Sequence, residues 1–212
     1  MNNTKKKSPI SWVPTAYFAM GLPFVVLNMV TVLMFKGLEV DDKLITFWTS
    51  LILLPWTLKP LWSPFLELFR TKKFFVIVTQ LITGVTFGLV AFALNLSHFF
   101  SISIALLAIV AFSGATHDIA CDGVYMSELS NEDQAKFIGW QGAFYNIAKI
   151  LATGGLVYLA GYFIELNADA GLLTANKRAW MIILLILSVT MILLGIYHLF
   201  ALPSTQSASS KK

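Results

Sequence analysis

Two acids and a histidine interrupt an otherwise apolar stretch between residues 116 and 125. That run reads Thr-His-Asp-Ile-Ala-Cys-Asp-Gly-Val-Tyr, with Asp118 and Asp122 four positions apart. This spacing puts both carboxylates on one face of a helix, one turn from each other. An ionisable group in hydrocarbon costs a few kcal/mol or more, so such groups usually face a polar cavity and serve function. The two carboxylates could bind protons or form an ion pair with a cation.

Two lysines are candidate partners. At about 1.5 Å per residue, Asp118 lies roughly 27 Å along its expected helix, and Lys59 lies roughly 22 Å along another that runs the same way. We therefore expect Lys59 to pair with Asp118 or Asp122, which would reduce the cost of burying both charges. Breaking and remaking this pair would couple protonation to movement, whereas a permanent pair would only hold helices together. Lys149 is placed to meet an anionic solute, unless its ammonium reaches out to the interface.

Other chemistries find less support. His117 and Cys121 stand beside the two acids and could suggest a metal site, but no second His/Cys cluster completes a coordination shell. His98 and His198 fall near expected helix ends, where we expect them at the membrane interface. We recognise neither a Ser/His/Asp nucleophile motif nor a Gly-rich phosphate loop. We therefore expect no metal, no cofactor and no enzymatic activity.

The elements that must position these residues are apolar helices. Of the 212 residues, 57% are hydrophobic and 12% are charged, which is too apolar for an ordinary soluble domain. Six stretches are each about long enough to cross a bilayer, since a crossing needs about 20 residues. We expect an all-α membrane protein with six transmembrane helices, at 11–35, 44–62, 74–95, 100–127, 137–164 and 179–202.

The basic residues predict the orientation. Nine of them fall on the side that carries both termini: Lys5, Lys6, Lys7, Arg70, Lys72, Lys73, Lys136, Lys211 and Lys212. The opposite side receives four: Lys36, Lys43, Lys177 and Arg178. Under the positive-inside rule both termini are cytoplasmic. We expect a cytoplasmic N-terminus at 1–10, a bundle at 11–202 and a flexible cytoplasmic tail at 203–212. Anionic lipid headgroups explain the basic runs better than nucleic acid does.

Prolines and glycines predict bends and close contacts. A kink is expected in the first helix at Gly21–Pro23, with Asn28 beyond it as a possible polar contact. The prolines within Pro55–Pro64 should bend the end of the second helix. Close helix packing is expected at Gly84–Gly88, a Gly-x-x-x-Gly motif, and at Gly154–Gly155.

Three stretches together resemble a known family: Tyr17–Pro23, Leu54–Pro64 and the run at 116–125. They are similar to the AmpG-type muropeptide permeases, a branch of the major facilitator superfamily that also includes acetyl-CoA transporters. The resemblance covers the first five helices and implies a secondary transporter of twelve helices in two halves. It implies alternating access, import of cell-wall sugar-peptides and proton coupling. His117 stands where Gln is common in the family, so the resemblance implies transport more firmly than this solute.

The candidate residues for a substrate path or gate follow from these considerations: Gly21, Pro23, Asn28, Lys59, His117, Asp118, Asp122, Tyr125, Gln141 and Lys149. The expected partners are the lipid bilayer of the cytoplasmic membrane, a small-molecule solute and protons. Six helices match only the N-terminal half of the family, so we also expect either a missing C-terminal half or a second copy of the chain. The alternative is a membrane assembly or receptor subunit without transport.

Overall fold

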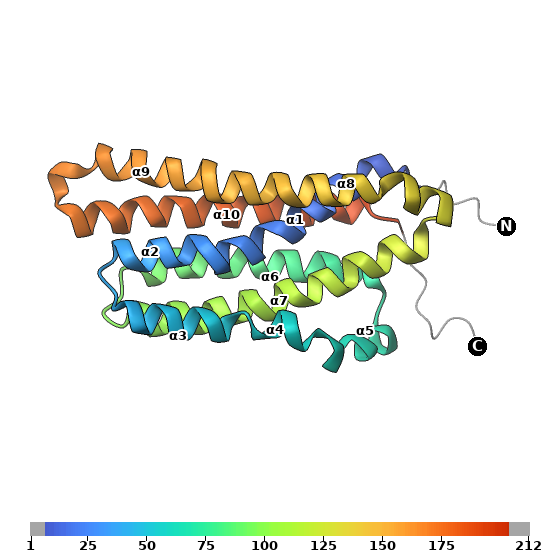
Figure 1. The fold of residues 1–212 in the computed structure, drawn as a ribbon, viewed down its shortest axis with the longest axis horizontal. Coiled ribbons are helices and arrows are strands. Elements are labelled where there is room, and N and C mark those ends of the chain that lie inside the picture. The colour runs from blue at the N-terminus through green and yellow to red at the C-terminus, as the bar shows by residue number, and fades with distance from the viewer. Residues whose placement is uncertain (1–6, 204–212) are drawn as a thin grey trace.

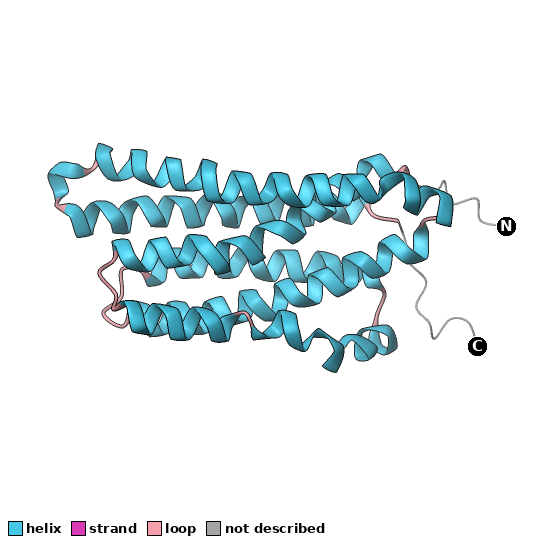
Figure 2. Ribbon diagram, viewed as in Figure 1, coloured by secondary structure: helices cyan, strands magenta, loops and turns pink. Residues whose placement is uncertain are grey.

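The computed structural model describes residues 7–203, and only the backbone at 67–69. Within this part every regular element is helical, as Figure 2 shows. Six helices are long and apolar enough to cross a membrane, so the chain is a multi-pass membrane protein by helix length and hydropathy. They extend over Pro9–Gly37, Asp42–Leu61, Lys72–Ala93, Phe99–Glu128, Asn131–Leu166 and Leu172–Ala201. The expected boundaries at 1–10 and 203–212 fall largely outside the described residues.

Several crossings are made of more than one helical segment. The first consists of α1 (Val13–Val25), a π-helical turn (Val26–Val30) and α2 (Thr31–Gly37). The second consists of α3 (Asp42–Ile52), α4 (Leu54–Leu58) and a 3₁₀ turn (Lys59–Leu61). The third and fourth are α6 (Lys72–Ala93) and α7 (Phe99–Glu128). The fifth is α8 (Asn131–Ile150), a π turn (Leu151–Leu156) and α9 (Val157–Leu166), and the sixth is α10 (Leu172–Ala201). The short α5 (Ser63–Phe69) links the second and third crossings.

The six crossings run alongside one another in a single elongated bundle (Figure 1). Helix α6 packs against both α7 and α10, while α1 packs against α7 and α8. The beginning of α1 and the end of α10 meet at one end of the bundle, where the Tyr197 hydroxyl donates to the Ser11 carbonyl (2.5 Å). We call this the terminal end.

Helix starts follow from local capping. Asp41, Thr71 and Ser130 precede α3, α6 and α8, and each side-chain oxygen accepts a backbone N–H of the first turn. The fifth and sixth crossings begin six and seven residues earlier than expected, at Asn131 and Leu172. The reason is that polar residues, which an apolar window excludes, continue the helix beyond the membrane-like segment. The other crossings end within three residues of their expected limits.

The prolines act where expected. The second crossing breaks at Leu53, two residues before Pro55, and tightens to a 3₁₀ turn at Pro60. In the first crossing Pro23 lies inside α1, and the π turn begins three residues later. Figure 1 shows α1 inclined to α2 on either side of this turn. Proline removes a backbone hydrogen bond, and a π turn is a common local adjustment to such a loss.

The two glycine expectations have opposite outcomes. A Cβ at Gly84 would lie 2.7 Å from Ile192 Cγ1 and 3.0 Å from the Ser188 carbonyl oxygen, so α6 and α10 do approach closely at this motif. The expectation for Gly154–Gly155 is wrong. A Cβ at Gly154 would meet nothing within 4 Å, because this pair lies in a π turn on an uncovered face.

The crossings are covered very unequally. In the most apolar window of each, 67% of residues are buried for the first crossing, but only 22% for the second and 17% for the fifth. The bundle therefore has a well-packed interior formed by α1, α6, α7 and α10, and it leaves α3 and the α8–α9 crossing largely exposed.

Candidate functional site

The centre of the candidate site is an ion pair between the second and fourth crossings. Lys59 Nζ lies 2.6 Å from Asp118 Oδ2, and Trp56 Nε1 donates to the same oxygen at 2.9 Å. The predicted pairing of Lys59 with one of the two acids is therefore present, with Asp118 as the partner. The Asp118 side chain is only 10% exposed, whereas the Lys59 side chain is 27% exposed. The charges meet where the buried middle of α7 faces the broken end of the second crossing.

The contact is close because small residues make room for it. A Cβ at Gly114, one turn before Asp118, would lie 2.9 Å from the Trp56 ring and 3.4 Å from Pro23. Trp56 also meets Phe24 edge to face at 5.3 Å. The first, second and fourth crossings thus converge beside the ion pair. Pro23 takes part in this convergence as a packing surface.

Only one of the two carboxylate oxygens of Asp118 has hydrogen-bond partners among the described residues. Its Oδ1 is buried and makes no hydrogen bond to any residue that the structure describes. A buried carboxylate oxygen without a partner is uncommon in proteins and costly unless it becomes protonated or binds something. The carboxylate thus holds Lys59 and Trp56 through one oxygen and keeps the other available.

Asp122 makes a different set of contacts. Its Oδ1 accepts the Tyr17 hydroxyl at 2.8 Å, and the same hydroxyl accepts Gln141 Nε2, also at 2.8 Å. These bonds link α7, α1 and α8. Asp122 itself is exposed. The two acids are one helical turn apart, but only Asp118 joins the ion pair.

A second polar group lies deeper in the bundle. Gln80 Nε2 donates to His117 Nε2 at 3.0 Å, and His198 Nδ1 donates to Gln80 Oε1 at 2.9 Å. The Thr15 hydroxyl lies 2.9 Å from His198 Nε2. We call these four residues the histidine chain. The single amide of Gln80 holds both imidazoles in fixed tautomers, and it joins α6, α7 and α10.

His198 lies in the last turn of α10, near the helix end as expected, but its side chain is fully buried within the bundle. The helix end at which it lies is covered by the first turns of α1, which supply Thr15. His98, in contrast, precedes α7 and is exposed. Depth along a helix therefore does not determine burial when a neighbouring helix extends past the same point.

The remaining candidates lie apart from the ion pair. The Tyr125 hydroxyl donates to the Gln134 carbonyl at 2.5 Å, which fastens the turn between α7 and α8. Gly21 is a contact glycine: a Cβ there would lie 2.8 Å from the Tyr145 carbonyl oxygen, so it lets α1 approach α8. Asn28 and Lys149 are both exposed. The segments that carry them are neighbours, because the π turn containing Asn28 contacts the π turn that follows Lys149.

Sequence reasoning missed several members of the two polar groups. Tyr17 and Trp56 lie inside the stretches that carry the family resemblance, but their hydrogen bonds to the acids could not be inferred from spacing. Gln80 was recognisable only as an amide in the middle of an apolar crossing. Among the described residues, no group of three or more His, Cys, Asp and Glu side chains gathers as metal ligands would.

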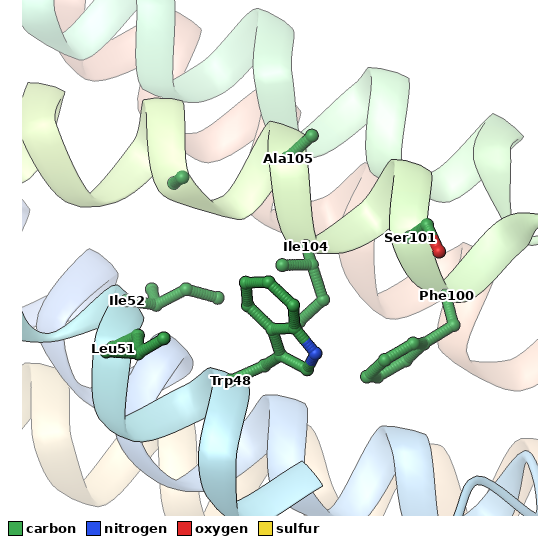
Figure 3. A pocket seen from close by; sticks show the side chains of 8 residues that line it. Trp48, Leu51, Ile52, Phe100, Ser101, Ile104 and Ala105 are labelled. Carbon is green, nitrogen blue, oxygen red and sulfur yellow. The ribbon is translucent and has the colours of Figure 1, made fainter. Parts of the chain in front are cut away.

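An open groove of about 340 Å³ lies on another side of α7. Figure 3 shows Trp48, Leu51 and Ile52 of α3 facing Phe100 and Ile104 of α7 across it. Neither Lys59 nor Asp118 lines this groove. Its lining is almost wholly apolar, as a surface in contact with lipid tails requires, so it is separate from the charged site.

Comparison with family models, with curated proteins and with solved structures found no match to this chain. The likeness to the AmpG-type permeases therefore rests on three short stretches of sequence alone.

The histidine chain permits a direct test of its contribution to stability. Replacing Gln80 by Met keeps the volume but removes both hydrogen bonds to the imidazoles. We expect the free energy of unfolding to fall by about 1–2 kcal/mol, since interhelical hydrogen bonds in membranes contribute that much at most. Denaturant unfolding in detergent, followed by circular dichroism, measures the change. Gln134→Met, at the half-buried turn between α7 and α8, is the matched control. An equal loss of stability in this variant would show that the buried histidine chain contributes no more than a half-buried amide does.

Proposed function

We propose that this chain is one six-helix half of a secondary active transporter of the major facilitator type. It moves a small polar or amphiphilic solute by alternating access, with proton coupling, and the resemblance suggests a cell-wall sugar-peptide. The observation that carries the proposal is the ion pair between Lys59 and Asp118, at 2.6 Å, joining two membrane crossings. Ionisable residues at such a depth are rare and usually functional.

The ion pair supports a gating role because one of its partners stands on a broken crossing, where the segment breaks could serve as hinges. Trp56 stands on the five-residue helix α4 and Lys59 on the three-residue 3₁₀ turn that follows it, and both segments come after the break at Leu53. Asp118 stands on the 30-residue helix α7. Displacement of the short segments would break the ion pair and leave the Asp118 carboxylate to take up a proton. Return of Lys59 would expel it, which couples protonation to opening.

The proposed transporter needs a second six-helix unit to enclose the solute path. Lys149 and Asn28 are exposed at mid-helix positions, and lipid contact would make an ammonium there expensive. We propose that a second six-helix unit faces them, either a C-terminal half or another copy of the chain. The solute path would then run between the two units, past the exposed face of α8 and α9. Rocking of one unit against the other would expose the path to each side in turn.

Orientation follows from charge. Lys73, in the first turn of α6, donates from Nζ to the Leu202 carbonyl at 2.9 Å, so the terminal end of the bundle lies beside the basic start of α6, which also carries Lys72 and follows Arg70. We propose that this end is cytoplasmic and that the membrane is the cytoplasmic (inner) one. Lys59 and Asp118 then form a cytoplasmic gate, and the Asn28–Lys149 level lies deeper along the path.

The test begins with the transcript beyond the codon for Lys212, which decides whether a second half exists to be reconstituted with this one. The resulting protein is placed in proteoliposomes and offered a radiolabelled cell-wall sugar-peptide. We expect uptake that rises with a proton gradient and disappears with a protonophore. Uptake no greater than in empty liposomes would contradict the proposed solute. Failure with every sugar and peptide solute tried would favour the assembly-subunit alternative.

A further inference from the structure

A second open groove runs along the outer surface between α6 and α7. Its volume is about 470 Å³, and its lining includes Phe74, Val78 and Ile82 from α6 and Ala108, Ile109 and Phe112 from α7. Phe74, Ile82, Ile109 and Phe112 are each more than 40% exposed. The groove is therefore an apolar trough open to the surroundings of the bundle, not an internal cavity.

The length of the trough fits one leaflet of a bilayer. From Phe74 to Ile82 the helix rises about 12 Å at 1.5 Å per residue. One leaflet has a hydrocarbon thickness of about 15 Å, half that of a typical bilayer core. The trough is therefore nearly as long as one leaflet is thick. A single acyl chain lying parallel to α6 would contact the trough along most of the chain's length.

The end of the trough is positively charged. The Arg70 guanidinium lies over the Phe74 ring, with 5.7 Å between the guanidinium carbon and the ring centroid, and Arg70 is exposed. Lys72 follows at the first position of α6, where the helix also presents the positive end of its dipole. An acyl chain in the trough would hold its headgroup at this level. Chain and cation together match a lipid with an anionic headgroup.

We propose that the trough between α6 and α7 is a specific site for one anionic phospholipid. Its acyl chain lies against Val78, Ile82 and Ala108, and its phosphate faces Arg70. This inference goes beyond transport, since it concerns binding to the outer surface of the bundle and does not depend on any solute. The groove of Figure 3 shares Ala108 with the trough but otherwise lies between α3 and α7, and it serves as an internal comparison because Arg70 is not among its lining residues.

Native mass spectrometry of the purified chain in detergent tests this site, with phosphatidylglycerol and phosphatidylcholine of identical acyl chains as the probes. We expect phosphatidylglycerol to be retained about fivefold more strongly, which corresponds to about one basic contact at the membrane surface. Arg70→Gln should bring its retention down to that of phosphatidylcholine. Arg178→Gln, at an exposed arginine near the opposite end, is the matched control and should leave the preference intact.

A second pair of variants tests the trough itself. Val78→Trp fills it from the half-exposed face of α6 and should lower retention of both lipids, whereas Ala105→Trp fills the other groove and should not affect the phosphatidylglycerol preference. Circular dichroism confirms folding of each variant. Equal retention of the two lipids by the unmodified chain would overturn the proposal, as would loss of the preference in Arg178→Gln to the same extent as in Arg70→Gln.

Discussion

Asp118→Asn is expected to lower solute uptake about tenfold or more while the chain still inserts and folds. Asparagine keeps the shape and can still accept from Trp56, but it leaves the Lys59 ammonium without the counterion now 2.6 Å away. A tenfold change corresponds to about 1.4 kcal/mol, well below the about 3–5 kcal/mol that breaking a buried pair can cost. Initial uptake rates of the sugar-peptide in proteoliposomes, normalised to inserted protein, measure the effect.

The chain offers a matched control for this variant. Asp42 also contacts a lysine, Lys36, at 3.6 Å, but both side chains are more than half exposed. An exposed pair contributes little, so Asp42→Asn should leave uptake unchanged. Wild-type uptake in Asp118→Asn would remove Asp118 from the mechanism. A loss in both variants alike would point to a general effect of charge.

Gly84→Ala is expected to destabilise the bundle by about 2–3 kcal/mol. The added methyl carbon would lie 3.0 Å from both the backbone nitrogen of Ile192 and the carbonyl oxygen of Ser188, and 2.7 Å from the Ile192 side chain. Side-chain rotation relieves only the last of these contacts. Helices α6 and α10 must therefore separate, and they form one of the main contacts of the bundle. The free energy of unfolding in detergent micelles measures the loss.

Gly142→Ala provides the comparison. Nothing lies within 4 Å of a Cβ at Gly142, which is on the exposed face of α8. In the isolated chain this substitution should be neutral or slightly stabilising, since alanine favours the helix. Equal destabilisation by the two substitutions would mean that helix propensity, not the contact between α6 and α10, determines the effect.

Hydropathy was sufficient to find all six crossings, because a chain that crosses lipid must do so in long, predominantly apolar helical stretches. It was insufficient for the starts of the fifth and sixth crossings. Ser130 and Gly171 begin the fifth and sixth crossings several residues before the apolar windows, through a cap and through a left-handed backbone conformation (φ 83°). The break of the second crossing at Pro55 was predictable from the residue alone. The pair Gly154–Gly155 was misread because packing depends on what faces a glycine.

The site was predictable only where depth along a helix decides the contact. Lys59 and Asp118 have similar depths, and the expected pair is present. The partner of Asp122 is Tyr17, from a helix whose rotation the sequence does not reveal. The burial of His198 likewise depends on where the first turns of α1 lie. The spacing of residues within one helix can be predicted from sequence. The rotation of one helix relative to another depends on side-chain packing across the whole bundle.

The two π turns have a consequence for chain length. Each has i to i+5 hydrogen bonds and so holds one residue more than an α-helical turn. One residue corresponds to about 100° of helix rotation. Deleting a single residue inside Val26–Val30 or Leu151–Leu156 would thus let the turn revert to α-helix and keep the two flanking segments in phase. A deletion anywhere else in the same crossings would turn one flank away from its partners. These two short stretches are where the transmembrane crossings can tolerate the loss of a residue.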